Sequence, residues 1–330
     1  MALVRPRQYI VQCIGMLACL LLPGSAAAAG AAYPDRPVRL VLPSTPGSGP
    51  DAVGRILATR LGAILGQQVV SDNRAGANGI LASEIVARAQ PDGHTLLMTS
   101  SSHTLNPHIH LKLPYDTLAD FTPVTRFVTT GGLVVVVHPG FAAKSIAQLI
   151  DMARAAPGKI AYASAGVGNL THLAAAMFFH AARIELTHVP YKGGGPAITD
   201  LIGGQVPLMF ASGPASIPFV KSGRLRALAY TGSKRSSQLP DVPTMDEAGV
   251  KGFESSSWYG IYGPARLPRA VVTRLYQTIR DAAHHPDARN AYAQFSIEPL
   301  DEPPEAFARF LREDLARNAT VVKAAGVTKQ

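Results

Sequence analysis

The chain alternates short apolar runs with helical patterns from Tyr33 onward, and turn residues separate each run from the next. Val38–Leu42 is a β-branched run that predicts a buried strand, and the apolar positions of 51–65 recur at helical spacing. Further strands are expected at 68–72, 95–99 and 121–128, with a helix at about 78–89 between the first two of these. This order indicates an α/β fold built from strand–helix–strand units.

A second unit of the same kind is expected to begin at 133–137, where one leucine precedes four valines. Ser145 with Gln148 forms a capping box at the start of a helix, and Thr244 with Glu247 forms another that Gly249 closes. The remaining pattern predicts strands at 160–163, 186–189, 208–211 and 226–230, and helices at 145–156, 171–181, from Pro196 and at 214–221.

Three amphipathic stretches, near 268–283, 287–295 and 304–325, follow an apolar run at 258–262. They have no predicted strand partners, so we expect them to pack back on the first unit. The result is a discontinuous first lobe, residues 33–130 and 257–330, and an inserted second lobe, residues 131–256. Each lobe is a doubly wound sheet, and two crossing strands form the hinge between them.

The first 32 residues have a different character. Arg5 and Arg7 precede an unbroken apolar run, Cys13–Leu22, and an alanine tract ends near Ala32, which is the pattern of a cleaved signal peptide. The run is shorter than the roughly 20 residues that a membrane-spanning helix needs. Both cysteines of the chain, Cys13 and Cys19, lie in this segment. The mature protein is therefore expected to be exported to the periplasm without disulfides or cysteine-ligated metals.

The chain carries a formal charge of +9, which becomes +7 without Arg5 and Arg7 because no acidic residue precedes Asp35. The basic residues are scattered and form no aromatic-interleaved stripe, which argues against nucleic acid as a partner. A diffuse positive charge suits a receptor or an enzyme for small anions. Composition does not choose between the two.

Four glycine-rich turns each follow a predicted strand and precede a predicted helix, where open α/β sheets bind ligands. Small residues let the backbone approach a ligand, and free N–H groups at a helix start attract anions. Two turns come from each expected lobe, so we expect them to meet at one interdomain cleft. They are 43–51, 73–79, 164–172 and 191–196.

Other readings of these segments are weaker. The glycines at 166 and 168 lack the third glycine of the dinucleotide fingerprint, and neither a phosphate-loop lysine motif nor a Gly-x-Ser-x-Gly elbow occurs. No cofactor is therefore expected. His172 and His188 are candidate general bases. His103, His108 and His110 are a weak metal candidate, since Pro107 interrupts them and no acid is near; we expect a solvated loop there and no metal.

Taken together, a series of segments resembles the substrate-binding receptors of tripartite tricarboxylate transporters, the Bug family. The resemblance covers essentially the whole mature chain. The segments that carry it are 43–51, Asn73-Arg74-Ala75-Gly76-Ala77, Pro91-Asp92-Gly93, Pro114-Tyr115-Asp116, 164–173, His188-Val189-Pro190-Tyr191-Lys192-Gly193, Leu225-Arg226-Ala227-Leu228, Pro240-Asp241-Val242-Pro243-Thr244 and Ser257-Trp258-Tyr259-Gly260.

The resemblance implies a type II periplasmic binding protein, a non-catalytic receptor whose lobes close on a small organic carboxylate. It would deliver the ligand to a membrane permease or to a sensor kinase domain, and we expect it to act as a monomer. Backbone N–H groups and hydroxyl donors of the first and third turns would hold the carboxylate. The candidate ligand-binding residues are Ser44, Thr45, Gly47, Ser48, Gly49, Asp51, Asn78, Ser101, Ser164, Gly166, Gly168, Asn169, Thr171, His172, Tyr191, Lys192, Gly193, Ala211, Ser212 and Trp258.

Within that set, Asp51 is expected to cap the first helix and orient its turn, with a ligand amine as its alternative partner. Tyr191 and Trp258 are expected to line the far end of the cleft. The alternative for Trp258 is that it packs at the hinge. Three positions depart from the family pattern: the first turn has Ser48-Gly49-Pro50 before Asp51, Ala211 stands where an aspartate is frequent, and His94 replaces an aromatic residue. The alternative function is an exported α/β hydrolase or lyase that acts on a small carboxylated substrate through His172 or His188.

Overall fold

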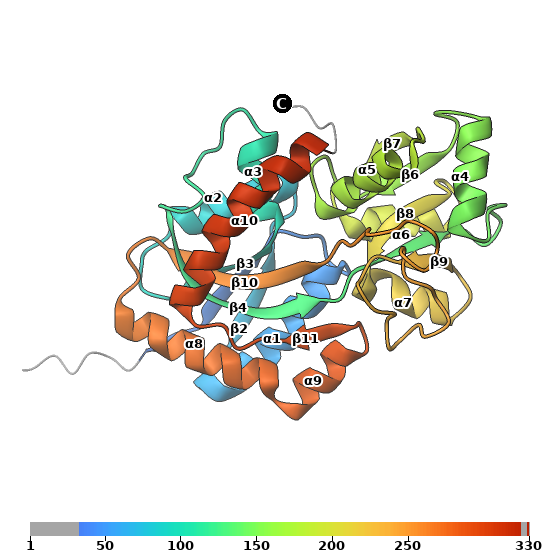
Figure 1. The fold of residues 1–330 in the computed structure, drawn as a ribbon. Coiled ribbons are helices and arrows are strands. Elements are labelled where there is room, and N and C mark those ends of the chain that lie inside the picture. The colour runs from blue at the N-terminus through green and yellow to red at the C-terminus, as the bar shows by residue number, and fades with distance from the viewer. Residues whose placement is uncertain (1–32, 325–328, 330) are drawn as a thin grey trace, which may run out of the picture. The chain divides into compact units, whose positions relative to one another are not determined.

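The computed structural model describes residues 33–324 and residue 329, so the predicted signal peptide lies outside the described residues. Arg36–Gln330 is one compact unit, and all the elements below belong to it. They form two mixed sheets with helices on both faces of each, which confirms the α/β prediction (Figure 1).

A six-stranded sheet has the order β11-β4-β10-β3-β1-β2. Its strands are β1 (Val38–Leu42), β2 (Val69–Asn73), β3 (Thr95–Ser100), β4 (Phe121–Thr130), β10 (Ser257–Pro264) and β11 (Ile297–Pro299). β1 pairs in parallel with β2 and β3, whereas β10 is antiparallel to β3 and β4. We refer to this sheet and its helices as lobe 1.

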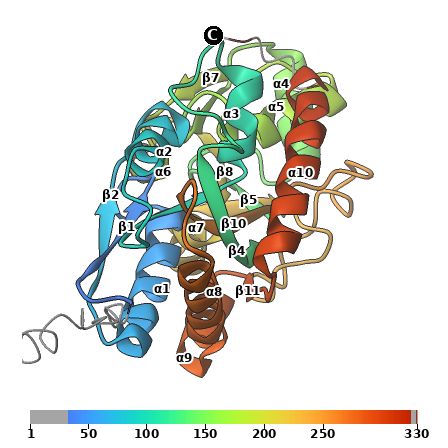
Figure 2. The ribbon, with the colours of Figure 1, turned by 90° about the vertical axis from the view of Figure 1, so that its left-hand side faces the viewer.

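The helices of lobe 1 cover both faces of its sheet. They are α1 (Gly49–Leu65), α2 (Ile80–Ala87) after the short 3-10 turn η1 (Ala77–Gly79), α3 (Ser102–Ile109), α8 (Arg269–His284), α9 (Pro286–Ala293) and α10 (Pro304–Ala324). Val41 and Leu97 face α2 and α10 in one core cluster, while Leu42 packs against α1 on the opposite face. Figure 2 shows α10 alongside α3, although some 200 residues separate them in the chain.

The five-stranded sheet of lobe 2 has the order β7-β6-β8-β5-β9. All five residues of β5, Leu133–Val137, are buried, because helices cover both faces, as expected for a continuous β-branched run. The other elements are α4 (Ile146–Ala155), β6 (Ala161–Ser164), α5 (Leu170–Ala182), β7 (Thr187–Pro190), α6 (Gly194–Ile202), β8 (Leu208–Ser212), α7 (Gly213–Lys221) and β9 (Arg226–Tyr230).

The chain passes between the sheets twice, from β4 to β5 and from β9 to β10. The passages lie side by side: Leu133 N–H donates to Thr231 Oγ1 at 2.7 Å, and Thr231 N–H donates to Leu133 O at 2.8 Å. A Cβ on Gly132 would lie 2.4 Å from the backbone nitrogen of Gly232, so this paired crossing requires glycine.

Four sequence predictions of secondary structure were wrong. Residues 102–109 form α3, a buried helix rather than a solvated loop, because apolar neighbours cover its polar residues. The terminal helices do have a strand of their own, β11, which three residues make too short to recognise from periodicity. α6 begins at Gly194, two residues before Pro196. Thr244 and Glu247 make both reciprocal capping bonds, but turns follow them instead of a helix.

Candidate functional site

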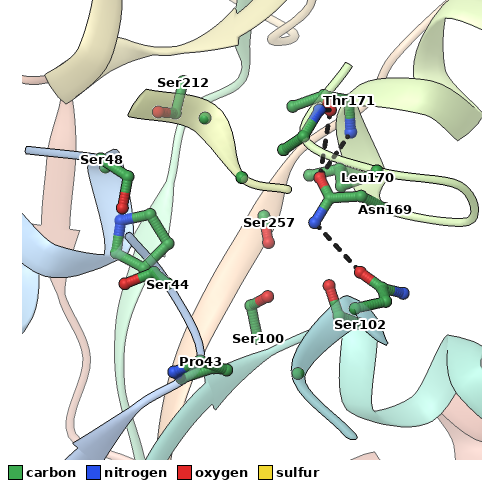
Figure 3. A pocket seen from close by; sticks show the side chains of 18 of the residues that line it. Pro43, Ser44, Ser48, Ser100, Ser102, Asn169, Leu170, Thr171, Ser212 and Ser257 are labelled. Carbon is green, nitrogen blue, oxygen red and sulfur yellow. Dashed lines mark hydrogen bonds between the residues drawn. The ribbon is translucent and has the colours of Figure 1, made fainter. Parts of the chain in front are cut away.

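A cavity of about 370 Å³ opens at the carboxyl ends of the parallel strands, between the loops of the two lobes (Figure 3). β1 and β3 end at it from lobe 1, and β6, β7 and β8 end at it from lobe 2. This is the edge at which open α/β sheets bind ligands, and all four glycine-rich turns contribute residues to its wall.

The first turn owes its shape to Gly47 and Asp51. Gly47 has φ +76°, a conformation that favours glycine, and its N–H donates to Asp51 Oδ2 at 2.9 Å. Asp51 Oδ1 accepts from Arg55 Nε and from Asn73 Nδ2, both at 2.9 Å. Burial alone would raise the pKa of Asp51, but the Arg55, Gly47 and Asn73 donors outweigh it and hold the pKa below its usual value. Asp51 is therefore ionised, and its hydrogen bonds stabilise the loop.

The hydroxyl groups of this turn have different partners. Ser48 Oγ donates to Thr45 O at 2.6 Å and so stabilises the turn itself. Ser44 lines the cavity with only 5% of its surface exposed, and its Oγ has no hydrogen-bond partner among the described residues. An unpaired buried hydroxyl costs free energy, so Ser44 Oγ is available for a ligand.

The third turn is fixed by Asn169, the N-cap residue of α5. Its Oδ1 accepts from Thr171 N–H at 3.1 Å, and its Nδ2 donates across to Asn78 Oδ1 of lobe 1 at 3.2 Å (Figure 3). Gly168 N–H donates to His172 Nδ1 at 3.0 Å, which requires that nitrogen to be unprotonated. The Asn169 side chain thus both shapes the turn and connects the lobes.

Beneath this turn lies a stack of aromatic rings. The His172 and His188 rings are 4.1 Å apart and nearly parallel, and His188 Nε2 lies 2.6 Å from Ser164 Oγ. Burial, followed by the neighbouring His172, lowers the pKa of His188 to about 4, and burial lowers the pKa of His172. Ser164 is fully buried, and neither it nor the two histidines lines the cavity. Neither His172 nor His188, one of which the hydrolase or lyase alternative requires as a general base, is thus a lining residue of the cavity.

The fourth turn meets the first across the cleft. Gly193 has φ +143°, and a Cβ there would lie 2.9 Å from Thr45 Cγ2 and Oγ1. Gly195 N–H donates to the same Thr45 Oγ1 at 3.3 Å. Tyr191 lines the cavity while its hydroxyl donates to Asp200 at 2.8 Å. Small residues here allow the two backbones to touch.

The structure separates the sequence-derived candidates into two groups. Those that line the cavity are Ser44, Ser48, Gly49, Asn78, Gly166, Asn169, Thr171, Tyr191, Lys192, Gly193 and Ser212. Those that do not are Thr45, Gly47, Asp51, Ser101, Ser164, Gly168, His172, Ala211 and Trp258. Most of the second group shape the turns or lie beneath them.

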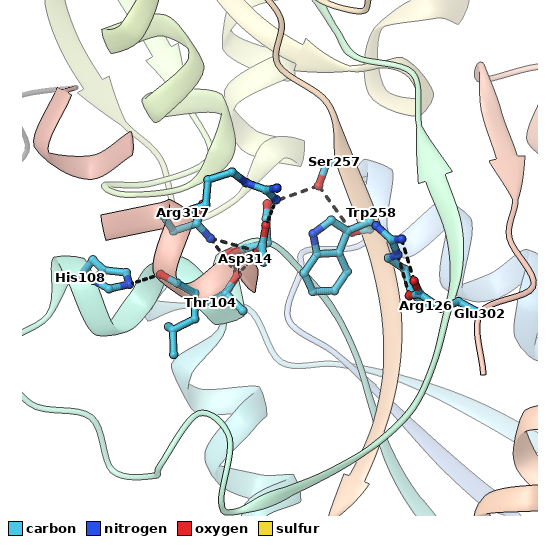
Figure 4. A network of polar contacts seen from close by, with 11 residues as sticks. Thr104, His108, Arg126, Ser257, Trp258, Glu302, Asp314 and Arg317 are labelled. Atoms are coloured by element: carbon cyan, nitrogen blue, oxygen red, sulfur yellow. Dashed lines mark hydrogen bonds and ion pairs between the residues drawn. The ribbon is translucent and has the colours of Figure 1, made fainter. Parts of the chain in front are cut away.

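Trp258 does not wall the cleft. Its ring lies edge-on to Phe307 at 5.6 Å and Phe310 at 5.4 Å in the lobe 1 core, whereas its neighbours Ser257 and Tyr259 line the cavity (Figure 4). Alternate residues of a strand face opposite sides, so the aromatic that the sequence singled out points away from the site. Ala211 is buried in the core of lobe 2, and the following Ser212, at the end of β8, lines the cavity.

The three histidines near 103–110 are dispersed by α3. His103 is buried among Tyr115, Phe121 and Tyr262, and His108 donates to Leu315 O at 2.8 Å. His110 lines the cavity; its Nε2 is shielded and finds no partner among the described residues. Over the part of the chain that is described, no histidine, cysteine and carboxylate side chains gather as a metal site.

Sequence reasoning missed a group of residues that line the cavity. Its members come from β3, both ends of α3, the passage from β4 to β5, β8 and β10. Ser100 carried a usable signal, because it directly follows the predicted strand 95–99, whereas the helix that begins at Ser102 was not recognised. The missed residues include Met98, Thr99, Ser100, Ser102, His110, Thr130, Leu133, Met209, Ser257 and Tyr259.

Comparisons with known proteins show which family has this architecture. The family model described as "Tripartite tricarboxylate transporter family receptor" matches residues 53–327. The protein BugT of Bordetella pertussis is 36% identical over 296 residues, which cover 89% of this chain and 90% of BugT. The solved structure of the periplasmic binding protein BugD is 35% identical with a TM-score of 0.87, covering 90% of this chain and 100% of that one. A Rhodopseudomonas palustris protein, Rpa4515, solved with adipate, is 33% identical with a TM-score of 0.87, covering 90% and 100%.

Proposed function

Because the chain belongs to the tripartite tricarboxylate transporter receptor family and has its two-lobed periplasmic binding protein fold, we propose that it captures a small organic carboxylate between its lobes. The family is one of substrate-binding receptors, and a solved relative holds adipate. The ligand would then pass to membrane permease subunits or to a sensor kinase domain, with the receptor acting as a monomer.

The observation that carries the proposal is the convergence of helix N-termini on one cavity. The first residues of α1, α5, α6 and α7 line it: Gly49, Leu170, Gly194 and Gly213. The dipoles of these helices favour an anion at their N-termini, and the two lobes supply them jointly. Ser44 Oγ, buried and unpartnered, adds a donor on the lobe 1 side.

The division of strands between the two sheets supports the proposed lobes, residues 33–130 with 257–330 and residues 131–256. Export by a cleaved signal peptide, residues 1–32, stays a prediction from the sequence. Within the described residues, no helix has both the length and the apolar character to cross a bilayer. Mass spectrometry of the periplasmic fraction should find a first residue between Ala27 and Tyr33, and an intact Met1 would contradict the export proposal.

Thermal denaturation with a panel of organic acids tests the binding proposal. A carboxylate at 100 times its dissociation constant should add about 2.7 kcal/mol of stability. Ser44→Ala should weaken the binding of the acid identified, while Ser222→Ala, an exposed serine outside the cavity, serves as the control. Absence of a shift with every carboxylate, or turnover of a carboxylate ester that His188→Ala abolishes, would contradict the receptor function.

A further inference from the structure

Among the described residues, the cavity lining contains a basic side chain but no acidic one. The basic residue is Lys192, exposed at the rim; the described lining also contains His110, but no aspartate, glutamate or arginine. Burial lowers the pKa of His110, which favours its neutral form. The cavity therefore offers an anion several donors and offers a cation no carboxylate.

Two acidic side chains that hydrogen-bond to residues of the cavity loops, Asp51 and Asp200, already have partners. Asp51 is buried, and both of its oxygens accept hydrogen bonds within lobe 1, from Gly47, Arg55 and Asn73. Asp200 does not line the cavity, and its Oδ2 accepts a hydrogen bond from the hydroxyl of Tyr191, which does. Neither carboxylate lines the cavity, so a ligand ammonium group inside it would have no direct counter-charge.

The neutral groups of the cavity divide between its two ends in Figure 3. Ser44 and Ser48 lie on one side, Asn169 and Thr171 on the other, and Ser100 and Ser257 lie between them. The helix N-termini that open on the cavity place positive potential there, so an ammonium group would meet repulsion as well as desolvation. A hydroxyl group in the same position can donate to or accept from the serines without either cost.

From these observations we propose that the cavity selects carboxylates without an ammonium group, such as hydroxy or unsubstituted acids, and rejects the corresponding amino acids. This inference rests on the proposed carboxylate receptor function and narrows its ligand class. The inference depends most on Asp51, the carboxylate for which a ligand amine was the alternative partner. Both of its oxygens already accept hydrogen bonds from within lobe 1.

Titration calorimetry on the mature protein with matched pairs of acids tests the selection. The probes are L-malate against L-aspartate, L-2-hydroxyglutarate against L-glutamate, and L-lactate against L-alanine, in which a hydroxyl replaces an ammonium. For the pair that binds best, the ammonium member should bind at least 100-fold more weakly, which corresponds to about 2.7 kcal/mol. Equal affinities would overturn the inference and leave the receptor function standing. No heat with any carboxylate would overturn the proposed function and the inference with it.

A designed counter-charge gives a second readout. Ser100→Asp places a carboxylate on the cavity wall and should shift the affinity ratio at least tenfold toward the ammonium member. Ser222→Asp, the same change on an exposed serine outside the cavity, should leave the ratio unchanged. If both variants shift the ratio equally, the discrimination comes from overall charge and the inference fails.

Discussion

Gly49 of lobe 1 lies so close to Ser212 of lobe 2 that a Cβ on Gly49 would be 2.3 Å from Ser212 Oγ and 3.0 Å from Ser212 Cβ. Gly49 is the first residue of α1 and Ser212 is the N-cap residue of α7, so two helix starts meet there. The φ angle of Gly49 is not in the left-handed region. Contact with the other lobe, rather than backbone conformation, therefore requires glycine at this position.

Gly49→Ala should therefore prevent this approach of the lobes. We expect the affinity for the carboxylate ligand to fall at least tenfold by calorimetry, with little change in the melting temperature of the ligand-free protein, because separated lobes relieve the clash. Ser48→Ala should cost less, since Ser48 Oγ donates to Thr45 O rather than to the cavity.

A second substitution makes the steric explanation falsifiable. Ser212→Gly removes both atoms that an alanine at position 49 would meet, so Gly49→Ala/Ser212→Gly should bind more tightly than Gly49→Ala alone. Gly47→Ala provides the contrast, because that position is strained at φ +76° but has no neighbour within 4 Å. If the double variant binds no better than the single one, contact with Ser212 is not the cause.

Two substitutions of Asn169 should distinguish its role as a helix cap from its hydrogen bond between the lobes. Asn169→Ser keeps an N-cap hydroxyl for Thr171 N–H but cannot reach Asn78, so we expect a roughly 2- to 10-fold loss of ligand affinity with a nearly unchanged melting temperature. Asn169→Ala also removes the cap and should lower stability by about 1 kcal/mol. Equal melting temperatures for the two variants would contradict this division.

Stability should decrease in mild acid. The pKa values of His188 and His103 are lowered to about 4 in the folded protein, chiefly by burial. Between about pH 6.5 and pH 4 the unfolded chain binds protons that the folded chain does not, so the free energy of unfolding falls as the pH falls, by at most about 1.4 kcal/mol per pH unit for each group.

His188→Gln should flatten this pH dependence without abolishing it, because His103 remains. Partial exposure of His188 makes its share the smaller of the two. Denaturant unfolding at a series of pH values measures both slopes. A variant whose stability follows the parent's pH profile throughout this range would show that His188 is not one of the responsible groups.

The stability of the protein should depend on Asp314, which attaches α10 to α3. This buried carboxylate accepts from Thr104 Oγ1 of α3 at 2.6 Å and from Asn318 at 3.1 Å, and it is ion-paired with Arg317 (Figure 4). Asp314→Ala should lower stability by about 2–4 kcal/mol, because Thr104 and Asn318 lose a charged acceptor.

Arg317→Ala is the matched control, since the Arg317 side chain is 60% exposed and its loss should cost less than about 1 kcal/mol. The same helix also contacts lobe 2, because Val322 lies in a small apolar cluster with Leu105 and Ile109 of α3 and Leu173 of α5. Similar melting temperatures for Asp314→Ala and Arg317→Ala would contradict the role assigned to the buried carboxylate.

Local sequence patterns predict most of the strands and helices and the positions of the four glycine-rich turns, but not α3 or β11. These features are local: the apolar run 133–137, the helical spacing of 51–65 and the turn residues act within a few positions of one another. The combined segments also identified the receptor family, which the family model confirms.

The role of each residue in those segments depends on its tertiary contacts. Register on β10 turns Trp258 into the core and Ser257 and Tyr259 into the cavity. Contacts from Arg55 and Asn73 commit Asp51 to the loop, and packing between the lobes gives Gly49 its constraint. Such roles depend on neighbours distant in the chain, and no local pattern encodes which side chain will lie opposite another once two sheets have folded.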